Sequence, residues 1–221
     1  WHLPNVDTKI PLENHNGKQR NCVTEPTFHP EYQYVLVMER GIVSLFHELS
    51  TQRIAGYNPN KIVNIFHQAV TKVKELHHDL KYVHCDLKPR NFLYVKRDGK
   101  EEQLLLCDMD AACEKDSQRD NSLKYSTGYC PPELARCIFT TNGGKLEKIK
   151  TSFDVWSLGV LLYELCTGQN LFPQDISNDN IVNEIDKTIL CAWHTIPDSY
   201  LALVDFPTNS QMTKDARNLI R

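Results

Sequence analysis

Several features that mark specialised classes of protein are missing from this 221-residue sequence. None of its eight cysteines forms a CxxC pair, which argues against a zinc knuckle or a thioredoxin-type redox site. No secretory signal peptide is visible, so the cysteines are expected to be free thiols in a reducing compartment rather than disulfides. The longest apolar run, Val155 to Leu165, is too short to cross a bilayer. The sequence therefore predicts no transmembrane segment.

The chain also lacks an excess of charge of one sign. Its 25 basic and 28 acidic residues give a formal net charge of −3, and no block of like charge stands out. This balance predicts neither a nucleic-acid-binding protein nor a protein of anionic membrane surfaces. With no targeting signal in view, the cytoplasm is the default location. The hydrophobic content of 41% is sufficient to bury the core of one large domain or of two small lobes.

The first half of the chain contains patterns of a strand and a helix. Tyr34 to Met38 is a short apolar run rich in strand-forming residues, and Gly41 ends it. Asn60 to Leu80 is predicted to be a helix with Asn58 or Asn60 as its N-cap. Its apolar residues recur at spacings of three and four and predict one buried stripe: Ile62, Phe66, Ala69, Val70, Val73 and Leu76.

A hairpin and a long loop follow this helix. Residues 92–95 and 104–107 read as two strands, and Asp98-Gly99 between them is a strong turn signal. Residues 113–130 are polar and irregular, as is typical of loops that carry function.

The remaining sequence predicts further helices. Residues 154–167 are apolar on nearly every face, which indicates a helix buried in a core, with Gly168 as its stop signal. A capped helix is expected to begin near Thr213.

The segment from His84 to Leu93 carries the clearest chemical signal. A helix leads into it and a hairpin leads out, so we expect Asp86, Lys88 and Asn91 to lie together at one edge. Phosphoryl transfer requires an orienting base for the attacking hydroxyl, a cation for the transferred group and ligands for magnesium. An aspartate, a lysine and an asparagine at this spacing supply all three.

Residues 84–91, His-Cys-Asp-Leu-Lys-Pro-Arg-Asn, resemble the catalytic loop HRDLKxxN of eukaryotic protein kinases. The resemblance implies that Asp86 is the catalytic base, that Lys88 contacts the γ-phosphate of ATP and that Asn91 binds the second magnesium ion. A lysine two positions after the aspartate is the serine/threonine-kinase form. Cys85 replaces the arginine that pairs with a phosphorylated activation segment, so such a phosphate is not expected to act through this position.

The tripeptide Asp108-Met109-Asp110 resembles the DFG motif of the same family. By this resemblance Asp108 is a magnesium ligand that bridges the metal to the phosphates of ATP. Met109 can replace phenylalanine as an apolar packing residue. Asp110 replaces a glycine whose freedom at positive φ permits a backbone flip, so the usual change to an inactive state is in question.

Two later segments extend the resemblance. Residues 125–133, Tyr-Ser-Thr-Gly-Tyr-Cys-Pro-Pro-Glu, are similar to the end of a kinase activation segment, GTxxYxAPE, which implies that Ser126 or Thr127 lies where the acceptor residue is positioned. Residues 154–159 match the motif DxWSxG, which implies that Asp154 holds the backbone of the catalytic loop.

The strand that ends at Met38 resembles the kinase hinge. The resemblance implies that Met38 is the gatekeeper and that the carbonyl of Glu39 and the amide of Gly41 meet the adenine of ATP. Leu93 would form the floor beneath the base, although ordinary core packing explains a leucine there equally well.

The expected fold is therefore α+β and protein-kinase-like, a mainly α-helical C-lobe with a remnant of the β-rich N-lobe. Residues 1–41 are predicted to be the remnant of the N-lobe and hinge, and residues 42–221 the helical C-lobe, incomplete at its C-terminus. Neither a glycine-rich phosphate loop nor a VAIK-type lysine precedes the hinge, so we expect those N-lobe elements elsewhere in a full-length chain and little turnover from these residues alone. Arg217 and Arg221 lie too early to be the arginine that pairs with Glu133.

The predicted function is that of an ATP-dependent protein Ser/Thr kinase, with ATP and Mg²⁺ as cofactors and a protein as substrate. One alternative is a small-molecule phosphotransferase of the aminoglycoside or choline kinase type, which shares an HxDxxxxN loop and an Asp-x-Asp at the metal position. Another is a pseudokinase, whose helical lobe binds partners without catalysis. The retained Asp86, Asn91 and Asp108 argue against that second alternative.

Overall fold

The computed structural model describes residues 39–221, except for 53, 55–57, 98, 119–124 and 141–147. Contacts divide the chain into the units Trp1–Met38 and Glu39–Arg221, and all elements below belong to the second unit. The strand predicted at Tyr34 to Met38 lies outside the described residues. Helices predominate over strands in the described part, which confirms an α+β fold with a mainly helical lobe.

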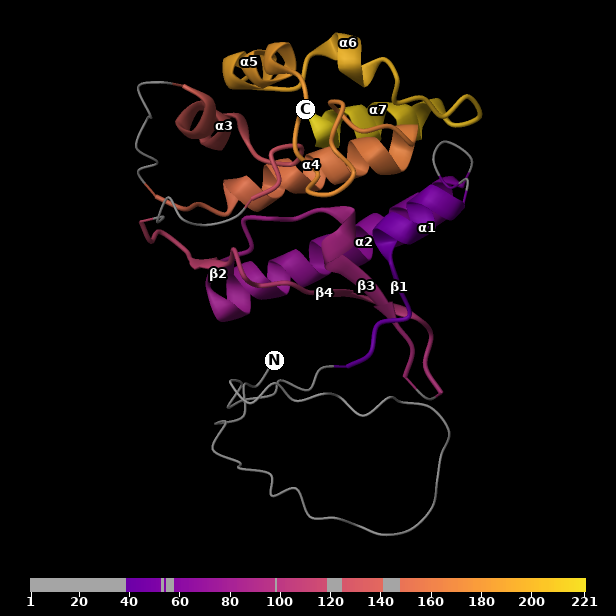
Figure 1. The fold of residues 1–221 in the computed structure, drawn as a ribbon. Coiled ribbons are helices and arrows are strands. Elements are labelled where there is room, and N and C mark those ends of the chain that lie inside the picture. The colour runs from indigo at the N-terminus through magenta and orange to yellow at the C-terminus, as the bar shows by residue number, and fades with distance from the viewer. Residues whose placement is uncertain (1–38, 53, 55–57, 98, 119–124, 141–147) are drawn as a thin grey trace, which may run out of the picture. The chain divides into compact units, whose positions relative to one another are not determined.

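Helix α4 (Ser152–Thr167) lies at the centre of this unit, between α2 and the C-terminal helices (Figure 1). Eleven of its residues are buried, because its apolar side chains point in nearly all directions and neighbouring elements cover most of them; Val155, near its start, is the exposed exception among its large apolar residues. Gly168 ends the helix at φ 70°, and its N–H donates to the Glu164 carbonyl at 2.8 Å. The predicted core helix and its glycine stop are thus confirmed.

Helix α2 (Pro59–Glu75) packs against α4 and against the strand β4, and it continues into the π-helical turn η1 (Leu76–Leu80). Asn58 is its N-cap, with the side-chain oxygen accepting from the Lys61 N–H at 3.1 Å.

The buried stripe of α2 is rotated slightly from the predicted one. Ile65 is 2% exposed and belongs to the core, whereas Val70 is 37% exposed. Both residues fit a spacing of three or four, and only the position of the packing partners decides between them.

A three-stranded antiparallel sheet lies beside α2, in the order β1 (Val43–Ser44), β3 (Phe92–Val95), β4 (Gln103–Leu106). The predicted hairpin is confirmed in β3 and β4, where Leu93 pairs with Leu105. Gly99, in the connecting turn, has φ 71°, a value that favours glycine. A second, two-stranded sheet joins β2 (Tyr82–Val83) to β5 (Cys113–Glu114).

The remaining described helices are short and lie around this core (Figure 1): α1 (Leu45–Thr51), η2 (Pro89–Asn91), α3 (Pro132–Phe139), α5 (Glu184–Ala192), α6 (Asp198–Leu201) and α7 (Ser210–Ile220). Helix α7 begins three residues before the predicted start at Thr213, because the Asn209 side chain caps it by accepting from the Met212 N–H at 3.0 Å.

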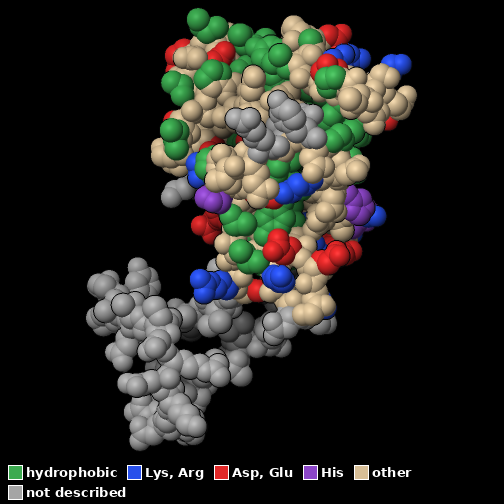
Figure 2. Space-filling view, turned by 90° about the vertical axis from the view of Figure 1, so that its right-hand side faces the viewer, with side chains coloured by type: hydrophobic (Ala, Val, Ile, Leu, Met, Phe, Trp, Pro, Cys, Tyr) green, Lys and Arg blue, Asp and Glu red, His purple; other side chains and the backbone are tan. Residues whose placement is uncertain are grey.

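The surface over the C-terminal helices carries exposed apolar side chains (Figure 2). None of the helices in the described ranges is both long enough and apolar enough to cross a membrane.

Candidate functional site

Asp154 holds the loop that precedes η2 from below. Its carboxylate is fully buried and accepts hydrogen bonds from the backbone N–H of His84 at 2.7 Å and of Cys85 at 2.9 Å. The His77 Nε2 lies 2.7 Å from the same carboxylate. Cys85 has φ 66°, so the chain bends sharply where Asp154 holds it. The role predicted for Asp154, supporting the backbone of this loop, is confirmed.

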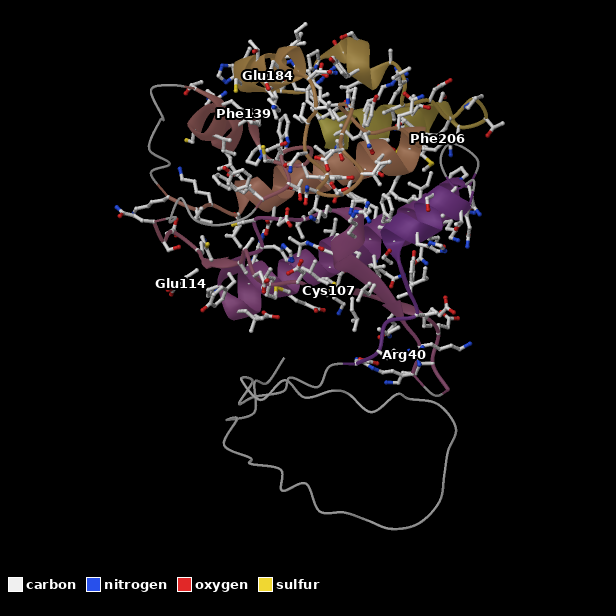
Figure 3. All side chains as sticks on the ribbon, in the orientation of Figure 1. Arg40, Cys107, Glu114, Phe139, Glu184 and Phe206 are labelled. Atoms are coloured by element: carbon white, nitrogen blue, oxygen red, sulfur yellow. The ribbon has the colours of Figure 1, made fainter. Side chains whose placement is uncertain are left out.

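The buried His84 ring joins this loop to the end of β4. Its Nε2 donates to the Cys107 carbonyl at 3.1 Å, and its Nδ1 accepts from the Asp86 N–H at 3.3 Å. The Cys107 N–H in turn donates to the Asn91 carbonyl at 2.9 Å. Cys107, labelled in Figure 3, is thereby fixed beside the loop, and it is the residue directly before Asp108.

Asp86, Lys88 and Ser126 form a tight triangle. The Asp86 carboxylate accepts from the Ser126 N–H at 2.9 Å, and its other oxygen lies 3.2 Å from the Lys88 Nζ. Lys88 Nζ also donates to the Ser126 Oγ at 2.7 Å. Both charged side chains are largely buried, so their positions are well defined before any substrate binds.

The sequence offered Ser126 or Thr127 as the residue at the position of the acceptor. Ser126 lies beside Asp86 and Lys88, and Thr127 does not. Thr127 instead bonds to the loop that follows α4: its N–H donates to the Asn180 Oδ1 at 3.0 Å, and its Oγ1 accepts from the Ile181 N–H at 2.8 Å.

Asn91 is oriented by Asp86. Its Nδ2 donates to the Asp86 carbonyl at 2.8 Å, which turns the amide oxygen, an atom suited to a hard cation, away from that bond. No group of three His, Cys, Asp or Glu side chains in the described part of the chain could hold a metal ion. Magnesium commonly takes only one or two protein oxygen ligands and completes its shell with phosphates and water. Asn91 and Asp108 fit that pattern.

Asp86, Lys88 and Asp108 line one cavity of about 550 Å³. The other lining residues come from three separate segments: Asp110, Ala111, Tyr125, Ser126, Ser177, Asn178 and Asn180. Three carboxylates and a lysine therefore face a space large enough for the triphosphate end of a nucleotide and an acceptor side chain.

The segment Asp108 to Asp110 differs from the loop opposite. Its three residues are exposed, and Asp108 has φ 63°. Asp110, the residue that replaces glycine in the motif, is not among the described residues with positive φ. The unusual backbone conformation therefore falls on Asp108, and in this conformation an aspartate at position 110 is not strained.

The residues predicted to hold adenine form a second group. A Cβ on Gly41 would lie 3.1 Å from the Leu93 Cδ1, so these two residues are in close contact. The Glu39 carboxylate pairs with Arg97 of the hairpin at 2.7 Å, and this interaction lowers the pKa of Glu39. Met38 lies outside the described residues. The group does not line the cavity around Asp86.

The loop between α4 and α5 is a part of the site that sequence patterns missed. Asp179 accepts from the Arg90 Nε at 3.1 Å, and its carbonyl accepts from the Gly128 N–H at 3.0 Å. Ser177, Asn178 and Asn180 of the same loop line the cavity. Asp179 lies 89 positions from Arg90, and no local pattern signals this pairing.

Tyr129, three residues after Ser126, and the buried Glu164 of α4 form a hydrogen-bonded pair, in which the Tyr129 hydroxyl donates at 2.7 Å. Burial raises the pKa of Glu164 to about 7, and burial beside this carboxyl also raises the pKa of Tyr129. The Ser157 Oγ donates to the Tyr129 carbonyl at 2.8 Å. Helix α4 therefore anchors the segment around Tyr129 through Glu164 and Ser157, and it anchors the loop that precedes η2 through Asp154.

The two arginines near the C-terminus contact other parts of the lobe. The Arg217 Nε donates to the Val204 carbonyl at 2.9 Å, and Arg221 pairs with Asp198. Within the described ranges, neither arginine forms an ion pair with Glu133.

A family model for the protein kinase domain matches residues 17–221 of the chain. Human ribosomal protein S6 kinase alpha-3 is 36% identical over 200 residues, which cover 85% of this chain and 25% of the relative. Ribosomal protein S6 kinase 2 alpha of Gallus gallus is 30% identical over 169 residues, or 73% of this chain and 20% of the relative. Human dual specificity tyrosine-phosphorylation-regulated kinase 3 is 28% identical over 139 residues, or 63% and 21%. The chain thus spans a quarter or less of the length of these relatives.

Proposed function

Because the chain belongs to the protein kinase domain family, we propose that it transfers the γ-phosphoryl group of ATP to serine and threonine hydroxyls of a protein substrate. The observation that carries this proposal is the triangle of Asp86, Lys88 and Ser126 at the wall of the cavity. In it a carboxylate and an ammonium group are held a few ångströms apart on the same loop, as the two sides of a phosphoryl transfer require.

In this proposal Asp86 receives the acceptor hydroxyl. Its carboxylate is fixed by Ser126 and Lys88, so it can orient the hydroxyl toward the phosphorus and accept its proton as the new bond forms. The Lys88 ammonium group stabilises negative charge on the transferred phosphoryl group. Both groups are already in place, and little free energy is needed to organise them during the reaction.

We further propose that Asn91 and Asp108 hold Mg²⁺, which when bound would neutralise charge on the phosphates of ATP. The Asn91 oxygen and the exposed Asp108 carboxylate are hard ligands; Asp108 lines the cavity, and Asn91 is bonded to the backbone of the lining residue Asp86. Adenine is proposed to lie against Leu93, with the carbonyl of Glu39 and the amide of Gly41 as its backbone partners. Leu93 and Gly41 are in contact, which supports one common surface for the base.

The domain boundaries also remain a proposal, with residues 1–41 as the N-lobe remnant and hinge and residues 42–221 as the C-lobe. The preference for serine and threonine is likewise a proposal. It is supported by Lys88, two residues after Asp86, and by the matched S6 kinases, whereas the matched kinase 3 carries "dual specificity" in its name.

An acceptor comparison tests the proposed function. The full-length protein is incubated with radiolabelled ATP, Mg²⁺ and three peptide libraries that contain serine, threonine or tyrosine as the one acceptor. We expect label in the serine and threonine libraries and its loss when the metal is chelated. Equal labelling of the tyrosine library would contradict the preference. Magnesium-dependent ATP binding without any transfer would indicate a non-catalytic scaffold, and transfer to small-molecule hydroxyls alone would indicate the phosphotransferase alternative.

A further inference from the structure

Asp179 is unusual among loop residues in its burial and in its backbone conformation. Its side chain is only 8% exposed, and its backbone has φ 58°. A buried carboxylate is strongly destabilising unless a cation and hydrogen bonds compensate it, and a non-glycine residue in the left-handed region is itself strained. Asp179 combines both costs, which are tolerated only where the surrounding structure holds the residue in place.

Arg90 supplies the compensating cation. Its Nε lies 3.1 Å from both Asp179 carboxylate oxygens, and another guanidinium nitrogen donates to the Ile176 carbonyl at 2.7 Å. The guanidinium carbon lies 3.6 Å from the centre of the Phe46 ring of α1. Arg90 is thus held on three sides by two separate elements, a geometry that the planar guanidinium favours and a lysine could not reproduce.

The same carboxylate reaches the proposed catalytic lysine. The Asp179 Oδ2 lies 3.5 Å from the Lys88 Nζ, compared with 3.2 Å from that nitrogen to Asp86 and 2.7 Å to Ser126. The four charges therefore alternate in sign along the line Asp86, Lys88, Asp179, Arg90. Lys88 has an anion on either side, and of these two anions only Asp179 has a second cation among the described residues.

The far side of the loop is bonded to the segment that carries Ser126. The Gly128 N–H donates to the Asp179 carbonyl, and Thr127 bonds to the next two residues of the loop. A Cβ on Gly128 would lie 2.7 Å from the Asp179 carbonyl oxygen and would also clash with the Gln174 side chain, so only glycine permits this approach. Asp179 cannot move away from Lys88 without breaking these contacts.

We propose that Arg90 is a positioning residue for phosphoryl transfer, which neutralises the buried Asp179 and so leaves Lys88 with Ser126 and Asp86 to meet the phosphoryl group. This inference rests on the proposed function. Without Arg90, the Asp179 carboxylate would have Lys88 as its nearest cation. The lysine would then move toward Asp179, and its ammonium group would pair with that carboxylate instead of with the transferred group.

A double-mutant cycle in the full-length protein tests this idea, with kcat and the KM for ATP measured for Arg90→Met, Asp179→Asn and the double variant. We expect Arg90→Met to lower kcat about 30-fold with KM changed less than about 3-fold, because Lys88 acts mainly on the transition state. Asp179→Asn should lower kcat about 3-fold. Adding Asp179→Asn to Arg90→Met should restore kcat to within about 5-fold of wild type, since the competing charge is gone.

Values of kcat per folded molecule, compared with the melting temperatures, separate positioning from plain structural support. If Arg90 only compensated the buried charge for the sake of the fold, Arg90→Met would lower the melting temperature but leave kcat per folded molecule within about 3-fold of wild type, and that result would overturn the proposal. A melting temperature is measured for each variant. Arg217→Met is the matched control: it removes another half-buried arginine that donates to backbone carbonyls, and it should lower stability without changing kcat.

A further variant decides the question if Arg90→Met does not fold. Arg90→Lys loses the guanidinium geometry but keeps the positive charge that neutralises Asp179, so it should retain more than about a third of wild-type kcat. A loss as large as about 30-fold in Arg90→Lys or in Asp179→Asn would assign the role to packing on Phe46 or to the loop itself, against the proposal. Absence of transfer by the wild-type protein would instead count against the proposed function.

Discussion

The two sides of the cavity are built very differently. On one side, buried groups hold the loop that carries Asp86 and Lys88. Asp154 accepts from the loop backbone, the His84 ring joins the loop to Cys107, and Ser126 bonds to the side chains of Asp86 and Lys88. On the other side, Asp108 to Asp110 are exposed, and the Asp108 carboxylate has neither a hydrogen bond nor an ion pair with another described residue. One side is organised by the protein, and the other presents exposed carboxylates.

This difference follows from the charges that each side is proposed to hold. The acceptor hydroxyl is neutral and binds weakly, so the groups that orient it gain most from being fixed in advance. A divalent cation with its phosphates carries enough charge to order its own ligands, so Asp108 needs only to be within reach. Phosphoryl transfer should therefore be sensitive to substitutions that disturb the packing around Asp86. At Asp108 it should depend instead on the concentration of the metal ion.

The largest effect is expected from Asp86→Asn. The amide cannot accept the hydroxyl proton, so kcat for phosphate transfer should fall about 10³-fold while ATP binding by calorimetry stays nearly constant. Asp79→Asn, at an exposed aspartate of η1, is the control and should retain full activity. If Asp86→Asn kept more than about a tenth of wild-type kcat, Asp86 would not be the catalytic base. The rigid surroundings of Asp86 would then have no catalytic explanation.

The second effect concerns the support of that side. In Asp154→Asn an amide nitrogen would face a backbone N–H of His84 or Cys85, where the carboxylate accepted from both. We expect unfolding free energy to fall by about 3 kcal/mol in denaturant titrations, the range for breaking a buried charged network. The exposed Asp205→Asn should change it by less than about 0.5 kcal/mol. Equal losses in both variants would show that Asp154 does not hold the loop.

The third effect tests the open side. Asp108→Asn should raise the Kd for ATP in the presence of Mg²⁺ about 100-fold and leave the much weaker metal-free binding unchanged, because a neutral amide is a poor partner for the cation. Asp110→Asn, at the neighbouring lining carboxylate, should raise it less than about 5-fold. If Asp110 proved equally important, an Asp-x-Asp metal site of the small-molecule phosphotransferase kind would fit better than the kinase arrangement.

Much of the fixed side could be predicted from sequence, because its signals are local. The run from His84 to Asn91, the hairpin after it and the helix from Asp154 to Gly168 each carry a pattern within a few residues, and the structure confirms the hairpin and the helix. The position of Asp154 beneath the loop followed only from the family resemblance, since 70 residues separate it from His84.

The rest depends on contacts that no local pattern contains. Val70 and Ile65 of α2 both fit the helical period, and only the packing of α4 and β4 decides which is buried. Asp179 lies in a polar stretch that reads as a solvated loop, but the fold places its carboxylate beside Arg90 and Lys88. Its positive φ also gave no signal, because aspartate is not the residue that usually marks such a position.

The smallest effect is a dependence of stability on pH that should belong to the fixed side alone. Glu164 has a pKa raised by burial to about 7, so the folded state keeps its proton above pH 4.5 while the unfolded state loses it. Stability from this group is therefore full below about pH 4.5 and declines up to about pH 7. Between pH 5 and pH 8 the decline should amount to about 2 kcal/mol.

Glu164→Gln should remove this decline and keep an acceptor for the Tyr129 hydroxyl, so the variant should be more stable than wild type at pH 8 and not at pH 5. Denaturant titrations at both pH values measure it. Glu184→Gln, at the exposed glutamate labelled in Figure 3, should leave the pH dependence of wild type unchanged. If Glu164→Gln kept the same slope, the Glu164 carboxyl would be ionised in the folded protein, and the charge beneath Tyr129 would have to be compensated by a cation.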